Sequence, residues 1–479
     1  MDVHLCVGTQ GWWQQTIRKL MQAVRRRAVQ GAFLTLVIAA VTVQVVRAAP
    51  APTGSVKYGI VFDAGSSGSR IHVYSWRVGG GGPKDAFDLI ADDLKKEKPG
   101  LSAYKEKTAE AGSSLTGLLN HARAKIPAAL HAETPIFLMA TAGLRMVGEK
   151  AKDEILASVC AELSSSGFLF RCEWATLLSG TDEGVYGWVT VNYLLDALYP
   201  SAAPVPPVGI IDLGGGSVQV VFASSTGKEL KHMDFGGRGH DTYIKSHLGY
   251  GLDEARRRTL ELAISRSSRS EKPARHPCLP KGATVDHGGV SVAGEGDWAR
   301  CLKLTTKLFA DSTWSIADMP PLPASIYGFS YMYDRTAAIG LLDSKPQTFG
   351  SVPMTIEAIS EAGKAVCGLD AEATKVRFAS TQDASKSNNY CGDAAYVAAL
   401  LSALGMTEKT QLTMTNKIKE VELVWTLGAM LAKSAELAGG GGSSSLLSRG
   451  LQIGLAGLAV YLLCRCCKAG QSRPQFYQK

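Results

Sequence analysis

The sequence lacks several patterns that would assign it to common enzyme and binding classes. It contains no Gly-Lys-Ser/Thr, so a P-loop NTPase is excluded as a first choice. The basic residues of Arg25–Arg27, Arg256–Arg258 and the segment Arg266–Arg275 have no interleaved aromatic residues, which argues against a nucleic-acid partner. No Asn-x-Ser/Thr glycosylation site occurs, which counts against a luminal location without excluding it.

The central part of the chain also lacks a CxxC pair or a Cys/His cluster, so no zinc site is indicated. It does contain an even number of cysteines, and sequential neighbours lie close together along the chain. The simplest pairing is therefore three local disulfides in an oxidising compartment. These cysteines are Cys160, Cys172, Cys278, Cys301, Cys367 and Cys391.

Long apolar runs occur only near the two ends. The uncharged run Gly31–Val46 follows several basic residues, so residues 1–30 are expected in the cytosol by the positive-inside rule. Val46-Arg47-Ala48 could be a signal-peptidase site, but the long preceding segment favours an uncleaved anchor. A second span is expected at 446–464, with a cytosolic tail at 465–479. The catalytic part would then be luminal or extracellular, at the Golgi, another endomembrane or the plasma membrane.

Two glycine-serine loops stand between strand-like runs, in YGIVFDAGSSGSRIHVYSW (58–76) and VGIIDLGGGSVQVVF (208–222). In P-loop and Rossmann units the glycine loop opens a helix, whereas each of these loops leads directly into a second strand, which predicts a hairpin. Helical periodicity is found at Glu149–Leu163, Gly184–Tyr199 and Ala394–Leu404. Predicted strands are Tyr58–Phe62, Ile71–Trp76, Pro135–Met139, Gly209–Ile211 and Val218–Phe222. The chain is therefore of the α/β class.

Each loop can bind phosphate. Glycines let several backbone N–H groups converge, and serine hydroxyls add donors. An aspartate, Asp63 or Asp212, ends the strand before each loop. A carboxylate beside phosphate is unfavourable unless a hard divalent cation, Ca²⁺ or Mg²⁺, lies between them. The alternatives are an ordinary glycine-rich hairpin and an aspartate that caps its own loop, but they explain the duplication poorly. Two facing loops around a metal-phosphate group imply two lobes with a cleft.

Five motifs carry a resemblance to a known family: DAGSSGSR (63–70), ATAGLR (140–145), LLSGTDEGVYGWVTVNYLL (177–195), DLGGGSVQ (212–219) and WTLGAML (425–431). In order and spacing they resemble the apyrase-conserved regions of the nucleoside triphosphate diphosphohydrolases, or apyrases. The resemblance implies a two-lobed actin-like (ribonuclease H-like) α/β fold with an inter-lobe active-site cleft. Lobe I would comprise 57–179 and 425–438, and lobe II 180–424.

The resemblance also implies roles for individual residues. Glu183, in a polar turn just before an apolar helix, would be the general base, and Ser217 and Gln219 would hold the attacking water. Asp63 and Asp212 would bind Ca²⁺ or Mg²⁺ through water, with Thr141, Glu183 and Trp425. Phosphate contacts would come from Ser66, Ser67, Gly68, Arg70, Thr141, Arg145, Gly214, Gly215 and Gly216. Candidates for stacking on the nucleobase are Tyr331, Tyr333 and Tyr396, although each could instead be core packing. Asp182 is expected to be only a helix N-terminal charge.

The expected reaction is hydrolysis of nucleoside tri- and diphosphates, such as ATP, ADP, GDP or UDP, to the monophosphate. Cell-surface vertebrate members commonly have histidine at the position of Gly68, so the glycine resembles plant and endomembrane members and leaves the tri- versus diphosphate preference open. Two alternatives remain: an exopolyphosphatase or guanosine pentaphosphate phosphatase on the same fold, and a nucleotide- or glycan-binding signalling protein. The sequence does not indicate an oligomeric state.

Overall fold

A computed structural model describes residues 54–438, except 66, 82–83, 200–203, 229, 236–237, 268–272, 343–351, 382 and 408–410. Ser66 and the expected membrane segments at 31–46 and 446–464 lie outside the described residues. Within the described part of the chain, no helix has the length and apolar character needed to span a bilayer.

The first sheet has five strands in the order β3-β2-β1-β4-β5. β1 pairs in parallel with β4, β4 with β5, and β2 pairs antiparallel with β3. The strands are β1 (Ser55–Ala64), β2 (Ser69–Val78), β3 (Asp88–Glu97), β4 (Ile136–Ala140) and β5 (Ala175–Leu177). The helices after β3 are α2 (Thr116–Lys125), α3 (Ala142–Arg145) and α4 (Glu149–Ser164).

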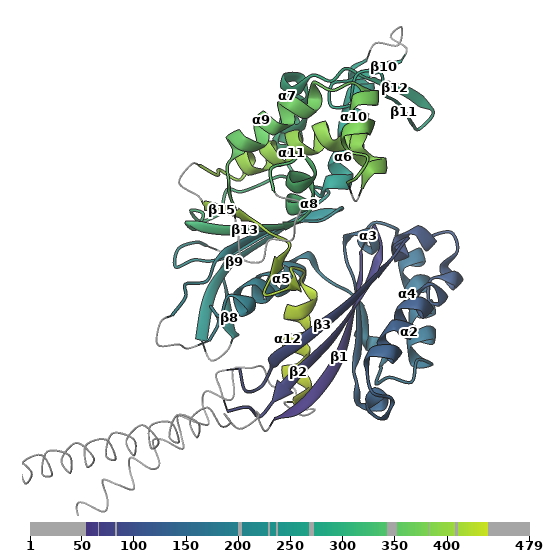
Figure 1. The fold of residues 1–479 in the computed structure, drawn as a ribbon, viewed down its shortest axis with the longest axis vertical. Helices are drawn as coiled ribbons and strands as arrows, with labels where there is room; N and C mark the ends of the chain where they lie inside the picture. Colours follow the sequence, from purple (N-terminus) through teal and green to yellow (C-terminus); the bar gives the residue numbers. More distant parts are fainter. Residues whose placement is uncertain are drawn as a thin grey trace, which may run out of the picture. The chain divides into compact units, whose positions relative to one another are not determined.

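Alternating residues of β1 pack on opposite faces of this sheet, as a fully buried strand requires. Ile60 and Phe62 join the core that contains Leu119 of α2 and Val159 of α4. Val61 joins a different core, made with two central helices, α5 (Gly180–Leu194) and α12 (Thr426–Ala438). Figure 1 shows α2 and α4 beside the first sheet.

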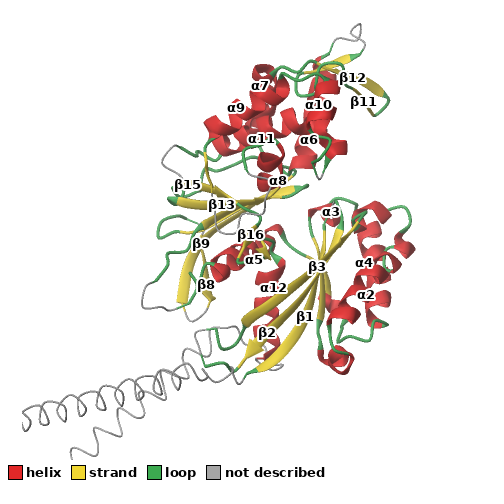
Figure 2. Cartoon of the chain, in the orientation of Figure 1, coloured by secondary structure: helices red, strands yellow, loops and turns green. Residues whose placement is uncertain are grey.

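The second sheet has seven strands in the order β14-β15-β13-β6-β7-β9-β8, with β6 and β7 near its middle. Its strands are β6 (Gly209–Leu213), β7 (Ser217–Ala223), β8 (Leu230–Phe235), β9 (Arg238–Leu248), β13 (Ser325–Ser330), β14 (Val352–Met354) and β15 (Gln411–Met414). Along β6, Ile210 packs in the core of α5 and α12, whereas Ile211 packs in a core with helix α11 (Tyr390–Ala403). Helices therefore cover both faces of this sheet (Figure 2).

The remaining helices follow the strands of the second sheet. They are α6 (Leu252–Arg266), α7 (Trp298–Thr306), α8 (Tyr331–Ala338), α9 (Ile356–Cys367), α10 (Ala371–Arg377) and α11 (Tyr390–Ala403). A small sheet comprises β10 (Ala274–His276), β11 (Thr284–His287) and β12 (Val290–Gly294), and β16 (Lys417–Ile418) pairs with β17 (Val421–Glu422). Short 3₁₀ turns lie at Leu101–Tyr104, Thr108–Glu110, Ser113–Leu115, Ala128–Glu133, Cys172–Trp174, Lys307–Ala310 and Ala384–Asn389.

The expected strands and helices are present, and the three local disulfides are confirmed as Cys160–Cys172, Cys278–Cys301 and Cys367–Cys391. One boundary differs in a way that affects the site. Helix α5 begins at Gly180, earlier than its apolar residues indicate, because the Ser179 hydroxyl accepts a hydrogen bond from the Asp182 N–H and caps the helix. Glu183 therefore lies in the first turn of the helix, not in a turn before it.

Candidate active site

The two glycine loops have the same closing bond. The Gly65 N–H donates to the Gly68 carbonyl at 3.1 Å, and the Gly214 N–H donates to the Ser217 carbonyl at 3.0 Å. β1 and β2 are neighbours in the first sheet, and β6 pairs antiparallel with β7 across the second loop. Both loops are therefore turns between adjacent strands, as the sequence predicts.

The carbonyl groups of the second loop are held by the segment that follows β9. The Gly214 carbonyl accepts from Leu252 N (2.9 Å), and the Gly215 carbonyl accepts from the N–H groups of Asp253 (3.0 Å) and Glu254 (3.2 Å) at the start of α6. The N–H of a peptide points opposite to its C=O, so the N–H groups of Gly215 and Gly216 turn away from α6. Consecutive N–H groups with this orientation suit an anion.

Three carboxyl groups from different parts of the chain are buried near one another. Asp63, Asp212 and Glu183 are only 5%, 6% and 8% exposed. Burial raises the pKa of Asp212 to about 6; a side-chain hydrogen bond with Ser330 opposes this rise and the charge of Asp63 adds to it. Burial likewise raises the pKa of Glu183 to about 8, against the effect of Arg145 and reinforced by Asp212 and Asp63. The charge of Asp63 therefore acts on both Asp212 and Glu183.

Glu183 is held directly by Arg145. An Arg145 Nη2 atom donates to Glu183 Oε2 at 2.7 Å and lies 3.4 Å from Ser217 Oγ. Gln219 Nε2 completes the cluster, 2.8 Å from Ser217 Oγ and 3.3 Å from Glu183 Oε2. The structure thus brings together the three residues expected to manage the water and its proton, and adds Arg145 as the ionic partner of the carboxylate.

The first loop and its neighbours place the other expected residues. Arg70 Nη1 donates to Asp63 Oδ2 at 2.8 Å, so the arginine is the ionic partner of the first aspartate. The Thr141 N–H donates to the Ala64 carbonyl, which places Thr141 beside the end of β1. A Cβ added at Gly68 would lie 2.9 Å from the Glu97 carbonyl, so a larger side chain here would require β3 to move. Trp425 is buried immediately before α12.

A family model for the GDA1/CD39 (nucleoside phosphatase) family matches residues 51–439, most of the chain. The chain belongs to this family. The expected apyrase resemblance is thereby confirmed.

Proteins similar to this chain occur in plants and vertebrates. Probable apyrase 6 of Arabidopsis thaliana is 31% identical over 80% of this chain and 73% of its own length. Ectonucleoside triphosphate diphosphohydrolase 5 of Gallus gallus is 32% identical over 78% of this chain and 86% of its own. The crystal structure of nucleoside triphosphate hydrolases from Neospora caninum superposes with a TM-score of 0.59 at 15% identity, covering 84% of this chain and 96% of that one. This likeness supports the two-lobed actin-like α/β fold.

The three tyrosines expected near the base differ in their surroundings. Tyr396 is 1% exposed and its hydroxyl donates to the Tyr250 carbonyl, so its burial favours core packing over base contact. Tyr331 is half-buried, with the guanidinium groups of Arg256 and Arg335 5.8 and 5.1 Å from its ring centre. It also shares a side-chain hydrogen bond with Ser67 of the first loop. Tyr333 is half-buried as well and packs against the core of the second sheet.

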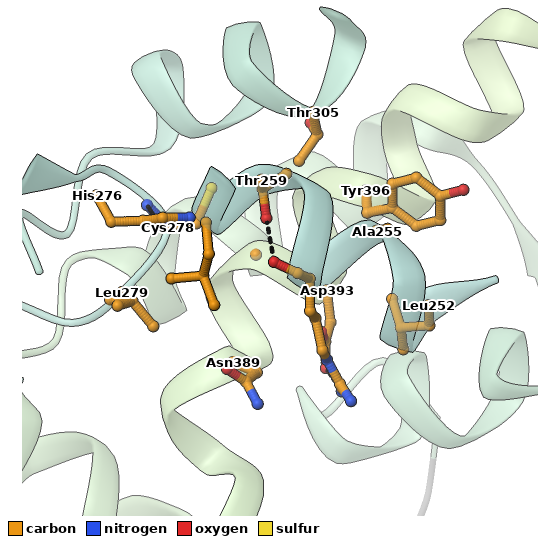
Figure 3. A pocket seen from close by; sticks show the side chains of 13 residues that line it. Leu252, Ala255, Thr259, His276, Cys278, Leu279, Thr305, Asn389, Asp393 and Tyr396 are labelled. Carbon is orange, nitrogen blue, oxygen red and sulfur yellow. Dashed lines mark hydrogen bonds and ion pairs between the residues drawn. The ribbon is translucent and has the colours of Figure 1, made fainter. Parts of the chain in front are cut away.

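A separate cavity of about 30 Å³ lies among α6, α11 and the Cys278 segment (Figure 3). Arg256 and Asp393 border it and form a two-bond ion pair, with Nε–Oδ1 at 2.8 Å and Nη2–Oδ2 at 2.6 Å. This volume suits one or two water molecules and is far too small for a nucleotide. The cavity is therefore not the substrate site.

Sequence reasoning missed one residue that reaches the cluster. Ser246 of β9 lies opposite Gln219 in the β7–β9 pairing, and its Oγ is 3.1 Å from Gln219 Nε2. The two residues are separated in sequence by the segment that contains β8. Ser246 could have been predicted only from the pairing of β9 with β7, and the residue pattern of a single strand does not specify its partner.

Proposed function

We propose that this protein hydrolyses the terminal phosphate of nucleoside tri- and diphosphates, with the monophosphate as end product. The observation that carries the proposal is the cluster of Glu183, Ser217 and Gln219 beside the Gly214–Gly216 loop. An oxygen-rich cluster next to an anion-binding turn is what in-line attack of water on a phosphorus atom needs. The relatives' names, apyrase and ectonucleoside triphosphate diphosphohydrolase, support a nucleotide substrate.

In the proposed reaction, Glu183 takes the proton from the attacking water, while Ser217 and Gln219 hold that water in line with the terminal phosphorus. Gln219 Oε1 is buried and has no hydrogen-bond partner among the described residues, so it is available as an acceptor for the water. Arg145 keeps Glu183 in place and favours its ionised form, which is the form a base requires. The N–H groups of Gly215 and Gly216, with Ser66, Ser67 and Thr141, would contact phosphate oxygens.

The residues present suit a hard divalent cation. Asp63 and Asp212 are buried oxygen donors, and the charge of Asp63 raises the pKa of Asp212, a repulsion that a cation would relieve. The described residues contain no group of three or more His, Cys, Asp or Glu that could ligate an ion directly. We therefore assign Asp63 and Asp212, with Thr141, Glu183 and Trp425, to a Ca²⁺ or Mg²⁺ site reached through water. When bound, the cation would neutralise phosphate charge.

We further propose that the chain is anchored in a membrane by 31–46 and 446–464, with the catalytic part luminal or extracellular. Three disulfides within the folded part support an oxidising compartment. The lobe boundaries at residues 179/180 and 424/425 belong to the same proposal. ATP, ADP, GDP and UDP are the substrates to compare first.

The test is Glu183→Gln, which keeps the size of the side chain and removes the base. We expect phosphate release from these nucleotides, with Ca²⁺ or Mg²⁺ present, to fall by about 10² to 10⁴-fold. The matched control is Asp182→Asn, because Asp182 is the neighbouring half-buried carboxylate, which accepts from the hydroxyl of the capping Ser179; it should stay within about threefold of wild type. Full activity in Glu183→Gln would rule out the assigned base. Release from polyphosphate in preference to nucleotides would favour the exopolyphosphatase alternative.

A further inference from the structure

Gln219 has more acceptors around its amide nitrogen than it has protons to donate. Nε2 lies 2.8 Å from Ser217 Oγ, 3.1 Å from Ser246 Oγ and 3.3 Å from Glu183 Oε2. The amide carries two N–H bonds, so the two hydroxyl oxygens at the shorter distances are the natural acceptors. Glu183 Oε2 already accepts from Arg145 at 2.7 Å, which leaves its contact with Gln219 the weakest of the three.

The positions of these acceptors matter because a glutamine amide can rotate by 180° and exchange its oxygen with its nitrogen. In the rotated orientation Oε1 would lie against the Glu183 carboxylate, and the attacking water would lose its acceptor. In the observed orientation, Oε1 has no partner among the described residues. Ser217 is itself assigned to the water, so Ser246 is the neighbour left to fix the amide.

The surroundings of Ser246 indicate that its position is built into the fold. Sheet register sets Ser246 directly opposite Gln219, on the same face of β7 and β9. Above it, the first residue of α5 is Gly180, where an added Cβ would lie 2.1 Å from Ser246 Oγ and 2.7 Å from Arg145 Nη1. The absence of a side chain at Gly180 thus leaves the space that the serine hydroxyl and the arginine occupy. Helix α5 also carries Glu183, so Ser246 lies against the first turn of the helix that supplies the base.

We propose that Ser246 is a positioning residue of the hydrolytic site. Its hydroxyl accepts one Gln219 Nε2 proton and so keeps Oε1 available to the attacking water. The inference rests on the proposed function, because it concerns the same water. Ser246 acts only through Gln219 and makes no contact with substrate.

The experiment compares Ser246→Ala, Ser246→Cys, Gln219→Ala and the double variant Ser246→Ala/Gln219→Ala in the full chain. Steady-state phosphate release from nucleotide gives kcat and KM, and thermal denaturation checks folding. We expect both Ser246 variants to lose about tenfold in kcat with KM within about twofold, since a thiol of similar size is a weak acceptor. Once Gln219 is absent, Ser246→Ala should cost less than about twofold more, because the two residues act as one unit.

The matched control is Ser360→Ala, which removes a half-buried serine hydroxyl that donates to the Ile356 carbonyl on α9. It should leave kcat unchanged. Wild-type kcat in Ser246→Ala, or an equal loss in the presence and absence of Gln219, would overturn the proposal. Normal kcat in Ser246→Cys with a loss in Ser246→Ala would show a packing role instead and would also overturn it. If the Ala variant does not fold, the Cys variant and its combination with Gln219→Ala decide in the same way.

Failure of the two proposals can be told apart. A wild-type chain that releases no phosphate from any nucleotide, or an active Glu183→Gln, contradicts the proposed function and this inference with it. An active wild type with an inactive Glu183→Gln and an unaffected Ser246→Ala contradicts the inference alone.

Discussion

The start of helix α6 donates hydrogen bonds to the carbonyl groups of the second glycine loop, so one added methyl group at this contact should strongly reduce activity. Gly251 precedes α6 with φ −70° and ψ 164°, a conformation open to any L residue, so alanine is not excluded by its backbone. A Cβ at this position would, however, lie 2.3 Å from the Gly215 carbonyl carbon and 2.4 Å from Gly215 O and Gly216 N. All three are backbone atoms of the loop proposed to bind phosphate.

The size of the effect follows from these distances. Ordinary contact begins at about 3.4 Å, so Gly251→Ala requires the loop and the start of α6 to separate by about 1 Å. Misplacement by about 1 Å costs an enzyme on the order of 100-fold in rate. Overpacking of this kind also destabilises the fold by ~1–3 kcal/mol. We therefore expect kcat/KM for nucleotide hydrolysis to fall by about 100-fold, with a measurable but smaller loss of thermal stability.

Gly368→Ala is the matched control. Gly368 likewise flanks a helix at negative φ (−71°), at the C-terminal end of α9, but its added Cβ would meet nothing closer than 3.5 Å. This variant should keep wild-type activity and stability within error. Phosphate release and thermal denaturation are measured for both variants under the same metal concentration. If Gly251→Ala retained activity within about threefold of wild type, the α6 hold on the loop would not position the phosphate donors.

Three further predictions concern stability. Asp393→Asn removes the buried two-bond partner of Arg256, which keeps its ion pair with Asp253 at 2.7 Å, so we expect a loss of about 2–3 kcal/mol by urea denaturation. Burial and the charge of Lys245 lower the pKa of His247 from 6.5 to about 4, so the unfolded state binds its proton more tightly. The free energy of unfolding is therefore highest above about pH 6.5 and decreases as the pH is lowered toward 4. At pH 5 protonation of His247 in the unfolded state should cost the wild type ~2 kcal/mol, a loss that His247→Phe should not show. Removing the Cys278–Cys301 disulfide by double alanine substitution should cost about 3 kcal/mol.

Each of these three stability predictions has its own control. The exposed pair Lys433–Glu436 should contribute under about 1 kcal/mol when broken, and an equally small loss in Asp393→Asn would contradict the buried-pair argument. A wild type and a His247→Phe variant that lose stability in parallel on acidification would show that His247 does not titrate as described. A reductant should destabilise the disulfide variant less than the wild type; equal shifts would mean that the bond contributes nothing.

Local patterns were sufficient for much of this fold. Alternation and glycine turns predicted the β1 and β6–β7 regions, and short separations along the chain predicted the disulfides. These features depend on neighbours in sequence, for which periodicity and chain length carry the information. The start of α5 was placed too late because one capping serine, Ser179, outweighed the onset of the apolar pattern.

The sequence by itself determined which groups are available: two glycine loops, the carboxylates of Asp63, Asp212 and Glu183, and the family motifs. Only the tertiary structure decided which groups meet. Arg145 reaches Glu183, Ser246 reaches Gln219, and α6 binds the carbonyls of the second loop through pairings between distant segments. Tyr396, polar at its tip and equivalent in sequence to any exposed tyrosine, is buried because its helix packs on the second sheet. Such contacts depend on strand register and helix packing, which a linear pattern does not specify.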